Sequence, residues 1–277
     1  MLFDETRLIE RFRSYAEMDT TSDETSQSLP SAAGEWKLAE HLAEELRRIG
    51  MKNVQVTPYG YVLAVLPAQG KQKPVMGLIA HMDTSPEANG SHVSVRIHSD
   101  YGGGVIPLNE QDVLDPVVFP ELKQYQGQSI LTSDGKSLLG ADDKAGICAI
   151  VSACEYLLQH PDIPHGEVHV AFTPDEELGR GTEQFPLEAF GAAYAYTVDG
   201  GELGELSYET FNASEARILF HGVSVHPGEA KGKMRNAVTI AAQWLQGLPA
   251  GERPEYTEDH EGFYHVTSMQ GTVEQAE

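Results

Sequence analysis

One apolar segment of the chain ends abruptly in groups that are costly to bury. Residues 75–80 read Val-Met-Gly-Leu-Ile-Ala, without a polar side chain. Such a run is typical of a strand in a parallel sheet that is covered on both faces. His81 and Asp83 follow it, so an imidazole and a carboxylate are expected at the carboxyl end of a buried strand. In open α/β sheets this end faces the functional crevice.

Other segments alternate between helical and extended patterns. Residues 36–46 and 144–158 carry apolar side chains at helical spacing, whereas residues 61–66, 167–172 and 194–198 read as strands. Strands separated by helices favour an α/β fold with a mostly parallel sheet and flanking helices. A helix is also expected within residues 1–18, and the Gly- and Pro-containing stretch 101–128 is expected to be an excursion from the sheet.

The pattern changes after Gly201. Residues 215–220 read as a half-exposed strand, and residues 236–245 as a helix. We therefore expect two domains, a catalytic one over residues 1–210 and a smaller α+β one over residues 211–277.

The charge balance excludes several classes of partner. Asp and Glu number 42 against 19 Lys and Arg, and the formal net charge is -23. Nucleic acid and anionic membranes attract cationic surfaces, so neither is expected as a partner. Cys148 and Cys154 lie on different sides of a predicted helix and are not expected to pair. Together with an N-terminus that lacks an apolar signal region, this predicts a cytoplasmic protein.

Acidic residues stand at other boundaries of the same kind. Glu176 and Glu177 follow one predicted strand, and Asp199 follows another. Asp142 and Asp143 open a predicted helix, where backbone N–H groups favour carboxylates. Carboxylates that converge on one crevice repel one another unless a cation lies among them, and imidazole with carboxylates suits zinc, manganese or cobalt. The set therefore predicts a metal site.

Taken singly, each of these clusters has a simpler interpretation. A histidine and an aspartate after a strand are more often part of a hydrogen-bonded loop. The pair Asp142 and Asp143 is more often a helix cap, and Asp199 before two glycines is consistent with a turn. None of these interpretations explains why three of the four clusters directly follow a predicted strand and the fourth opens a predicted helix.

Five long motifs carry a family resemblance: HMDTSP, TSDGKSLLGADDKAGI, PHGEVHVAFTPDEELG, AYTVDGGELGEL and VHPGEAKG. In order and spacing they resemble the tripeptide aminopeptidase (peptidase T) family of dinuclear zinc exopeptidases. The resemblance covers the N-terminal two thirds of that family. It implies a zinc-exopeptidase-like catalytic domain and an incomplete smaller domain for lid and dimerisation functions, hence a homodimer when complete.

The resemblance also implies roles for individual residues. His81, Asp142 and Asp199 would hold one zinc ion. Asp142, as a bridge, and Glu177 would hold the second. The peptide bond between Asp142 and Asp143 would be cis, as in relatives.

Catalysis would then depend on groups that do not hold metal. Asp83 would orient His81, and Glu176 would be the general base that hydrolyses the N-terminal residue from short peptides, especially tripeptides. A free α-amino group of the substrate would lie among the surplus carboxylates. His226 would stabilise the oxyanion in a partner subunit, and Asn236 would face the substrate.

The sequence departs from the family at one point: relatives continue beyond the position that matches Glu277. There a late histidine completes the second zinc's ligands. We therefore expect the second ion to be weakly held and the 277-residue chain to hydrolyse tripeptides little or not at all. Two alternatives remain open: a catalytically silent fragment that only associates with other chains, and a related zinc amidase or deacylase.

Overall fold

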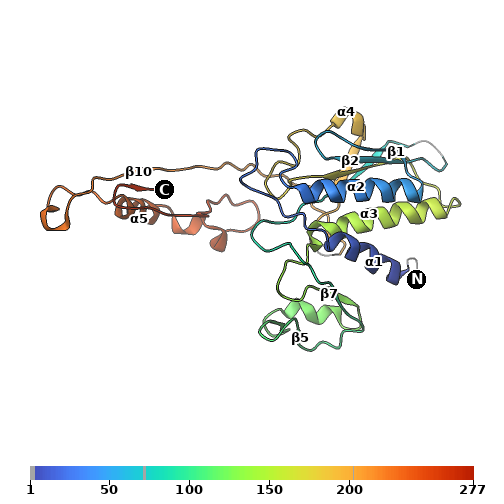
Figure 1. Cartoon of the computed structure of the whole chain (residues 1–277), viewed down its shortest axis with the longest axis horizontal. Coiled ribbons are helices and arrows are strands. Elements are labelled where there is room, and N and C mark those ends of the chain that lie inside the picture. Colours follow the sequence, from blue (N-terminus) through green and yellow to red (C-terminus); the bar gives the residue numbers. More distant parts are fainter. Residues whose placement is uncertain (1–3, 71–72, 202) are drawn as a thin grey trace. The chain divides into compact units, whose positions relative to one another are not determined.

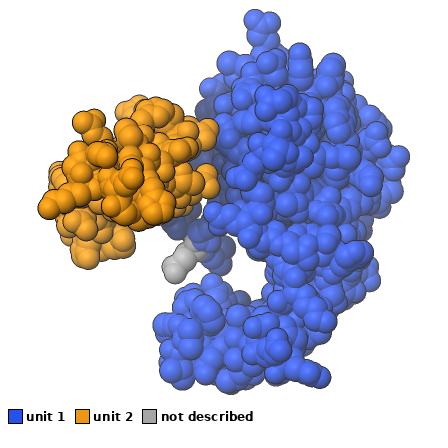
Figure 2. Space-filling model, turned by 60° about the vertical axis from the view of Figure 1, so that its left-hand side comes forward, with its two compact units in different colours: residues 1–205 blue, residues 206–277 orange. Residues whose placement is uncertain are grey.

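The computed structural model describes residues 4–70, 73–201 and 203–277. It divides the chain into two compact units, residues 1–205 and 206–277 (Figure 2). This division lies close to the boundary expected at residue 210, and the functions assigned to the two parts remain predictions. The first three residues of the expected N-terminal helix lie outside the described range.

The first unit is built on a five-stranded mixed sheet in the order β1-β2-β8-β3-β9. Strands β8, β3 and β9 run parallel, while β1–β2 and β2–β8 are antiparallel pairs. The predicted α/β class is confirmed, with the parallel strands extended on one side by an antiparallel pair. The strands are β1 (Lys52–Val56), β2 (Val62–Leu66), β3 (Met76–His81), β8 (Val168–Thr173) and β9 (Tyr194–Thr197).

Three long helices cover one face of this sheet (Figure 1). They are α1 (Glu5–Ala16), α2 (Ala33–Ile49) and α3 (Ala141–Gln159). Their apolar stripes form the main core with the inward side chains of the strands, among them Leu42, Ile147 and Phe172. On the opposite face the short helix α4 (Leu187–Phe190) packs through Phe190 against Leu63 and Ala171. Helices on both faces explain why the inner strands β2, β3 and β8 read as nearly continuous apolar runs.

Between β3 and α3 the chain forms the expected excursion. It contains two small antiparallel sheets, one of β4 (Arg96–His98) with β7 (Ile130–Thr132) and the other of β5 (Ile106–Pro107) with β6 (Val113–Leu114). A 3-10 helix, η1, spans Pro120–Tyr125.

The second unit contains helix α5 (Ala237–Gln246) as predicted. The strand expected over residues 215–220 is much shorter, because only β10 (Phe220–His221) pairs, with β11 (Gln275–Ala276). Three short 3-10 helices complete the unit: η2 (Pro227–Glu229), η3 (Ala250–Glu252) and η4 (Pro254–Tyr256).

Among the described residues, none of the helices combines the length and the apolar character needed to cross a bilayer. The cysteines Cys148 and Cys154 are both buried and free, as predicted.

Candidate metal centre

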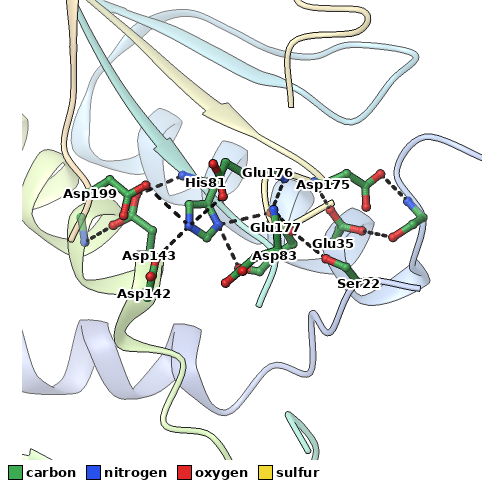
Figure 3. Close-up of polar contacts among 12 residues, drawn as sticks. Ser22, Glu35, His81, Asp83, Asp142, Asp143, Asp175, Glu176, Glu177 and Asp199 are labelled. Atoms are coloured by element: carbon green, nitrogen blue, oxygen red, sulfur yellow. Dashed lines mark hydrogen bonds and ion pairs between the residues drawn. The ribbon is translucent and has the colours of Figure 1, made fainter. Parts of the chain in front are cut away.

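The site lies where the three parallel strands of the first unit end. His81 is the last residue of β3, while Glu176 and Glu177 follow β8 and Asp199 follows β9. Asp142 comes from the start of α3, so residues from four separate segments meet at one edge of the sheet (Figure 3). The structure thus brings together the four predicted metal ligands His81, Asp142, Glu177 and Asp199.

His81 is the centre of the cluster and is almost completely buried. Its Nδ1 lies 3.1 Å from the backbone oxygen of Asp83 and 3.2 Å from Oδ1 of the same residue. Its Nε2 lies 2.8 Å from Oδ1 of Asp142 and 3.8 Å from Oδ2 of Asp199. Since Asp83 accepts from Nδ1–H, Nε2 is the nitrogen that remains for an ion.

The pKa of His81 reflects these carboxylates. Burial alone would lower it, but the hydrogen bond and the charge of Asp83 outweigh burial and raise the pKa to about 10. The same contacts, together with a hydrogen bond from Ser22, hold the pKa of Asp83 below its ordinary value despite burial. The pair is therefore a charged imidazolium beside a carboxylate in the ion-free protein.

The other carboxylates show the opposite shift. Burial, followed by the charge of Asp199, raises the pKa of Asp143 to about 8. Burial, and then the charge of neighbouring carboxylates, also raises the pKa values of Glu176, Glu177 and Asp199. The positive charge of His81 lowers these three pKa values and so offsets part of the increase. These directions reflect burial first and the negative charge of neighbouring carboxylates second.

Two adjacent aspartates at the start of α3 have separate roles. Asp143 is buried, and its carboxylate accepts from the backbone N–H groups of His81 at 3.1 Å and Gly146 at 3.1 Å. It therefore caps the regular part of α3, which begins after the non-helical backbone of Asp142 and Asp143, as the simpler interpretation held. Asp142 has a side chain that is 65% exposed and faces His81. The peptide bond between the two aspartates is cis, which confirms the prediction.

Gly146 lets the first turn of α3 approach the end of β9. A Cβ atom at this position would lie 2.0 Å from the backbone oxygen of Val198. Any larger residue would push the helix away from the strand that carries Asp199.

Potential ligand atoms form two groups within 4.8 Å, His81 with Asp143 and Asp199, and His81 with Asp142 and Glu177. We favour Asp142 over Asp143 as a ligand because both oxygens of Asp143 already accept backbone hydrogen bonds. One imidazole with several carboxylates is a donor set that fits zinc, manganese or cobalt. The residues present therefore fit a divalent metal centre.

Three supporting residues had no predicted role. Ser22 Oγ donates to Oδ2 of Asp83 at 2.6 Å. Glu35 and Asp175 form a buried pair beside the two glutamates, on the side away from Asp199 (Figure 3). The only local signal was that Glu35 stands in the first turn of a helix, where capping glutamates occur.

The remaining predicted residues belong to the second unit and make local contacts. Nδ1 of His226 accepts from the N–H of Gly228 at 3.2 Å. Oδ1 of Asn236 accepts from Val238 N–H at 3.0 Å and caps α5. Roles of His226 and Asn236 toward a substrate remain predictions.

Known proteins share both the sequence and the fold. A family model for the M20 peptidase dimerisation domain matches residues 208–277. Peptidase T from Geobacillus thermodenitrificans is 55% identical over 271 residues, 97% of this chain and 66% of the relative. Peptidase T from Listeria monocytogenes is 53% identical over 272 residues, with the same coverage. The chain thus spans just under two thirds of the length of these relatives.

Solved structures support the fold. The aminopeptidase PepT from Bacillus cereus has a TM-score of 0.62 at 22% identity, and a tripeptidase from Staphylococcus aureus has a TM-score of 0.65 at 18% identity. Each match covers 100% of this chain and 65% of the other.

Proposed function

Because this chain belongs to the peptidase T family, we propose that its first unit carries the catalytic site of an aminopeptidase that removes the N-terminal residue from tripeptides and other short peptides. The observation that carries the proposal is the meeting of His81, Asp142, Glu177 and Asp199 at the ends of three parallel strands. Their ligand atoms come from segments that are far apart in the sequence, and no local structural need explains such a meeting.

These four residues are proposed to hold two zinc ions. His81, Asp142 and Asp199 supply three donors for one ion, while Asp142, as a bridge, and Glu177 supply donors for the other. Two such ions, when bound, polarise the scissile carbonyl and lower the pKa of the attacking water. With three donors against two, the first ion is expected to bind more tightly.

Glu176 is the proposed general base. Its carboxylate is half exposed, so it faces solvent at the site, and Oε2 lies 3.9 Å from Nε2 of His81. Burial and the charge of Asp199 raise its pKa, a direction that suits an acid–base group. It would accept a proton from the attacking water and donate it to the leaving amine. The surrounding carboxylates would attract the free α-amino group of a peptide, which suits cleavage at the amino end.

The second unit is proposed to pair with a second copy of the chain. The match of residues 208–277 to a peptidase dimerisation domain supports this proposal. His226 would then reach the partner's site. Light scattering after size-exclusion chromatography measures the pairing, and a monomer at micromolar concentration would contradict it.

Glu176→Gln tests the catalytic proposal in a chain completed with the C-terminal segment in which the relatives continue, because the 277-residue chain alone is expected to turn over little or no tripeptide. The variant keeps the length of the side chain and removes the proton acceptor, so tripeptide turnover should fall by about 10²–10⁴-fold relative to the same chain with Glu176. Zinc content should stay the same, because Glu176 is not a proposed ligand. Glu183→Gln, which changes an exposed glutamate in the same connection, should leave both turnover and zinc content unchanged. Turnover of Glu176→Gln within twofold of the parent would contradict the role of this residue.

A further inference from the structure

Three consecutive backbone N–H groups in the acidic turn after β8 donate to two buried carboxylates. The N–H groups of Glu176 and Glu177 donate to Oδ1 and Oδ2 of Asp83, each at 3.0 Å. The preceding N–H, that of Asp175, donates to Oε2 of Glu35 at 3.0 Å. The backbone that carries both glutamates is thus fixed from β3 on one side and from α2 on the other.

Glu35 makes this contact from the first turn of α2, where its side chain is fully buried. Its other oxygen, Oε1, accepts from the N–H of Ala32 at 3.0 Å and from Oγ of Ser31 at 3.3 Å. Ala32 is the N-cap residue and has no polar side chain to accept from the first turn, whereas Glu35 at N3 accepts from the N–H of Ala32, as a glutamate does in a capping box. One carboxylate therefore joins the start of the helix to the acidic turn.

The contact is reciprocal. Oδ2 of Asp175 accepts from the N–H of Ser31 at 2.8 Å. Asp175 is fully buried and has a φ of 50°, a left-handed conformation that is uncommon for residues other than glycine. The turn therefore has its shape because Asp175 and Glu35 hold each other's backbone segments.

A requirement for tight packing alone would not place two carboxyl groups here. Burial, followed by the charge of Asp175, raises the pKa of Glu35 to about 8. Within the described residues, Oδ1 of Asp175 is buried without a hydrogen-bond partner. Such an arrangement costs stability that an apolar pair would not. It is consistent with a functional need to fix the turn.

We propose that Glu35 is a positioning residue for Glu176 and Glu177, acting through the backbone N–H of Asp175. Its hydrogen bonds go to the backbone N–H groups of Ala32 and Asp175 and to the hydroxyl of Ser31. The inference rests on the roles proposed above for Glu176 and Glu177.

Hydrogen–deuterium exchange of the 277-residue chain tests the contact without relying on activity. Glu35→Ala removes the acceptor, and Glu35→Asp keeps the charge but is one methylene too short to hold both the cap and the turn. Both should speed exchange within residues 174–180 by about tenfold, beyond any change elsewhere. Glu35→Gln keeps the length but has one acceptor oxygen in place of two. With that oxygen toward the N–H of Asp175, its NH₂ faces the N–H of Ala32, so it should speed exchange in this segment less than Glu35→Ala and Glu35→Asp do.

The matched control is Glu45→Ala, which removes another buried glutamate of the same helix that contacts Arg11 and Tyr15 instead. In Glu45→Ala, exchange within residues 174–180 should not speed up more than exchange in the rest of the chain. Two results would overturn the proposal: unchanged protection of this segment in Glu35→Asp, or a loss in Glu35→Ala that is equal throughout the chain. If Glu35→Ala does not fold, Glu35→Asp decides.

Titration with Co²⁺, followed by visible absorption, tests the consequence for the site. In Glu35→Ala and Glu35→Asp the ion held by Glu177 should bind about tenfold more weakly, whereas the ion held by His81 and Asp199 should bind as in the parent. Glu35→Gln, which keeps one of the two acceptor oxygens, should weaken binding of this ion less than Glu35→Ala and Glu35→Asp do. Equal affinities in all variants would contradict the positioning role. Failure of the parent chain to bind Co²⁺ would contradict the proposed metal centre, and the exchange result would then decide the inference on Glu35.

Discussion

Nε2 of His81 lies 2.8 Å from Oδ1 of Asp142, although 61 residues separate them. The contact joins the end of β3 to the start of α3, and Asp83 already occupies the other nitrogen of the imidazole. An ion that binds here must replace this hydrogen bond and take Nε2 as its ligand. The orientation of the ring by Asp83 is therefore central to the site.

Asp83→Asn should weaken metal binding. The amide has one oxygen in place of two, so it cannot accept from both the Glu176 and Glu177 N–H groups, and its NH₂ faces a donor. Zinc affinity, measured by calorimetry, should fall by about 10–100-fold. Asp162→Asn changes an exposed aspartate and should leave the affinity unchanged. Equal affinities for the two variants would argue against Asp83 as the residue that holds His81.

The pH dependence of stability should reveal Glu35. Its ordinary pKa of 4.5 is raised in the folded chain to about 8. Between these values the folded state binds more protons than the unfolded state, so this group makes stability fall as pH rises. Glu35→Gln cannot ionise at this position. The Tm of the variant minus the Tm of the parent should therefore rise by about 3–6 °C between pH 5 and pH 8. The exposed Glu40→Gln is the control. A Tm difference that does not change with pH would contradict this account.

Arg11→Met should destabilise the first unit. The buried guanidinium donates to Glu45 at 3.1 Å and to Glu155 at 2.7 Å, and so joins α1 to α2 and α3. Methionine would leave two buried carboxylates without this cation, a loss of about 3–5 kcal/mol of unfolding free energy. Urea denaturation measures it, with the exposed Lys37→Met as control. A loss below about 1 kcal/mol would mean that solvent or other cations satisfy these carboxylates.

Apolar runs and acidic boundaries were enough to predict four of the five strands of the sheet and the acidic clusters at its edge, whereas the choice of ligands within these clusters followed from the family resemblance. Residues 75–80 predicted β3, and His81 and Asp83 stood directly after it because strand ends meet at one edge of an α/β sheet. Gly50, with a φ of 106°, ends α2, and glycine is the commonest residue at a helix end of this conformation. Local sequence patterns can predict these features because each pattern depends on the residues of a single helix or strand.

Other parts of the fold could not be predicted. Strand β1 lies at the edge of the sheet and has mostly exposed side chains, so it lacks the apolar pattern of its neighbours. Glu35 and Asp175 are 140 residues apart, and their contact leaves no local pattern in either segment. The acidic pattern alone did not separate Asp142 from Asp143, whereas in the structure both oxygens of Asp143 accept backbone hydrogen bonds.

The most direct test of the proposed metal centre is anomalous X-ray diffraction at the zinc edge from crystals grown with zinc. We predict a peak about 2.0–2.2 Å from Nε2 of His81 and from carboxylate oxygens of Asp142 and Asp199. A second, weaker peak should lie beside Glu177, about 3.5–4 Å from the first. Zinc peaks only at other histidines, with Nε2 of His81 still bonded to Asp142, would contradict the account.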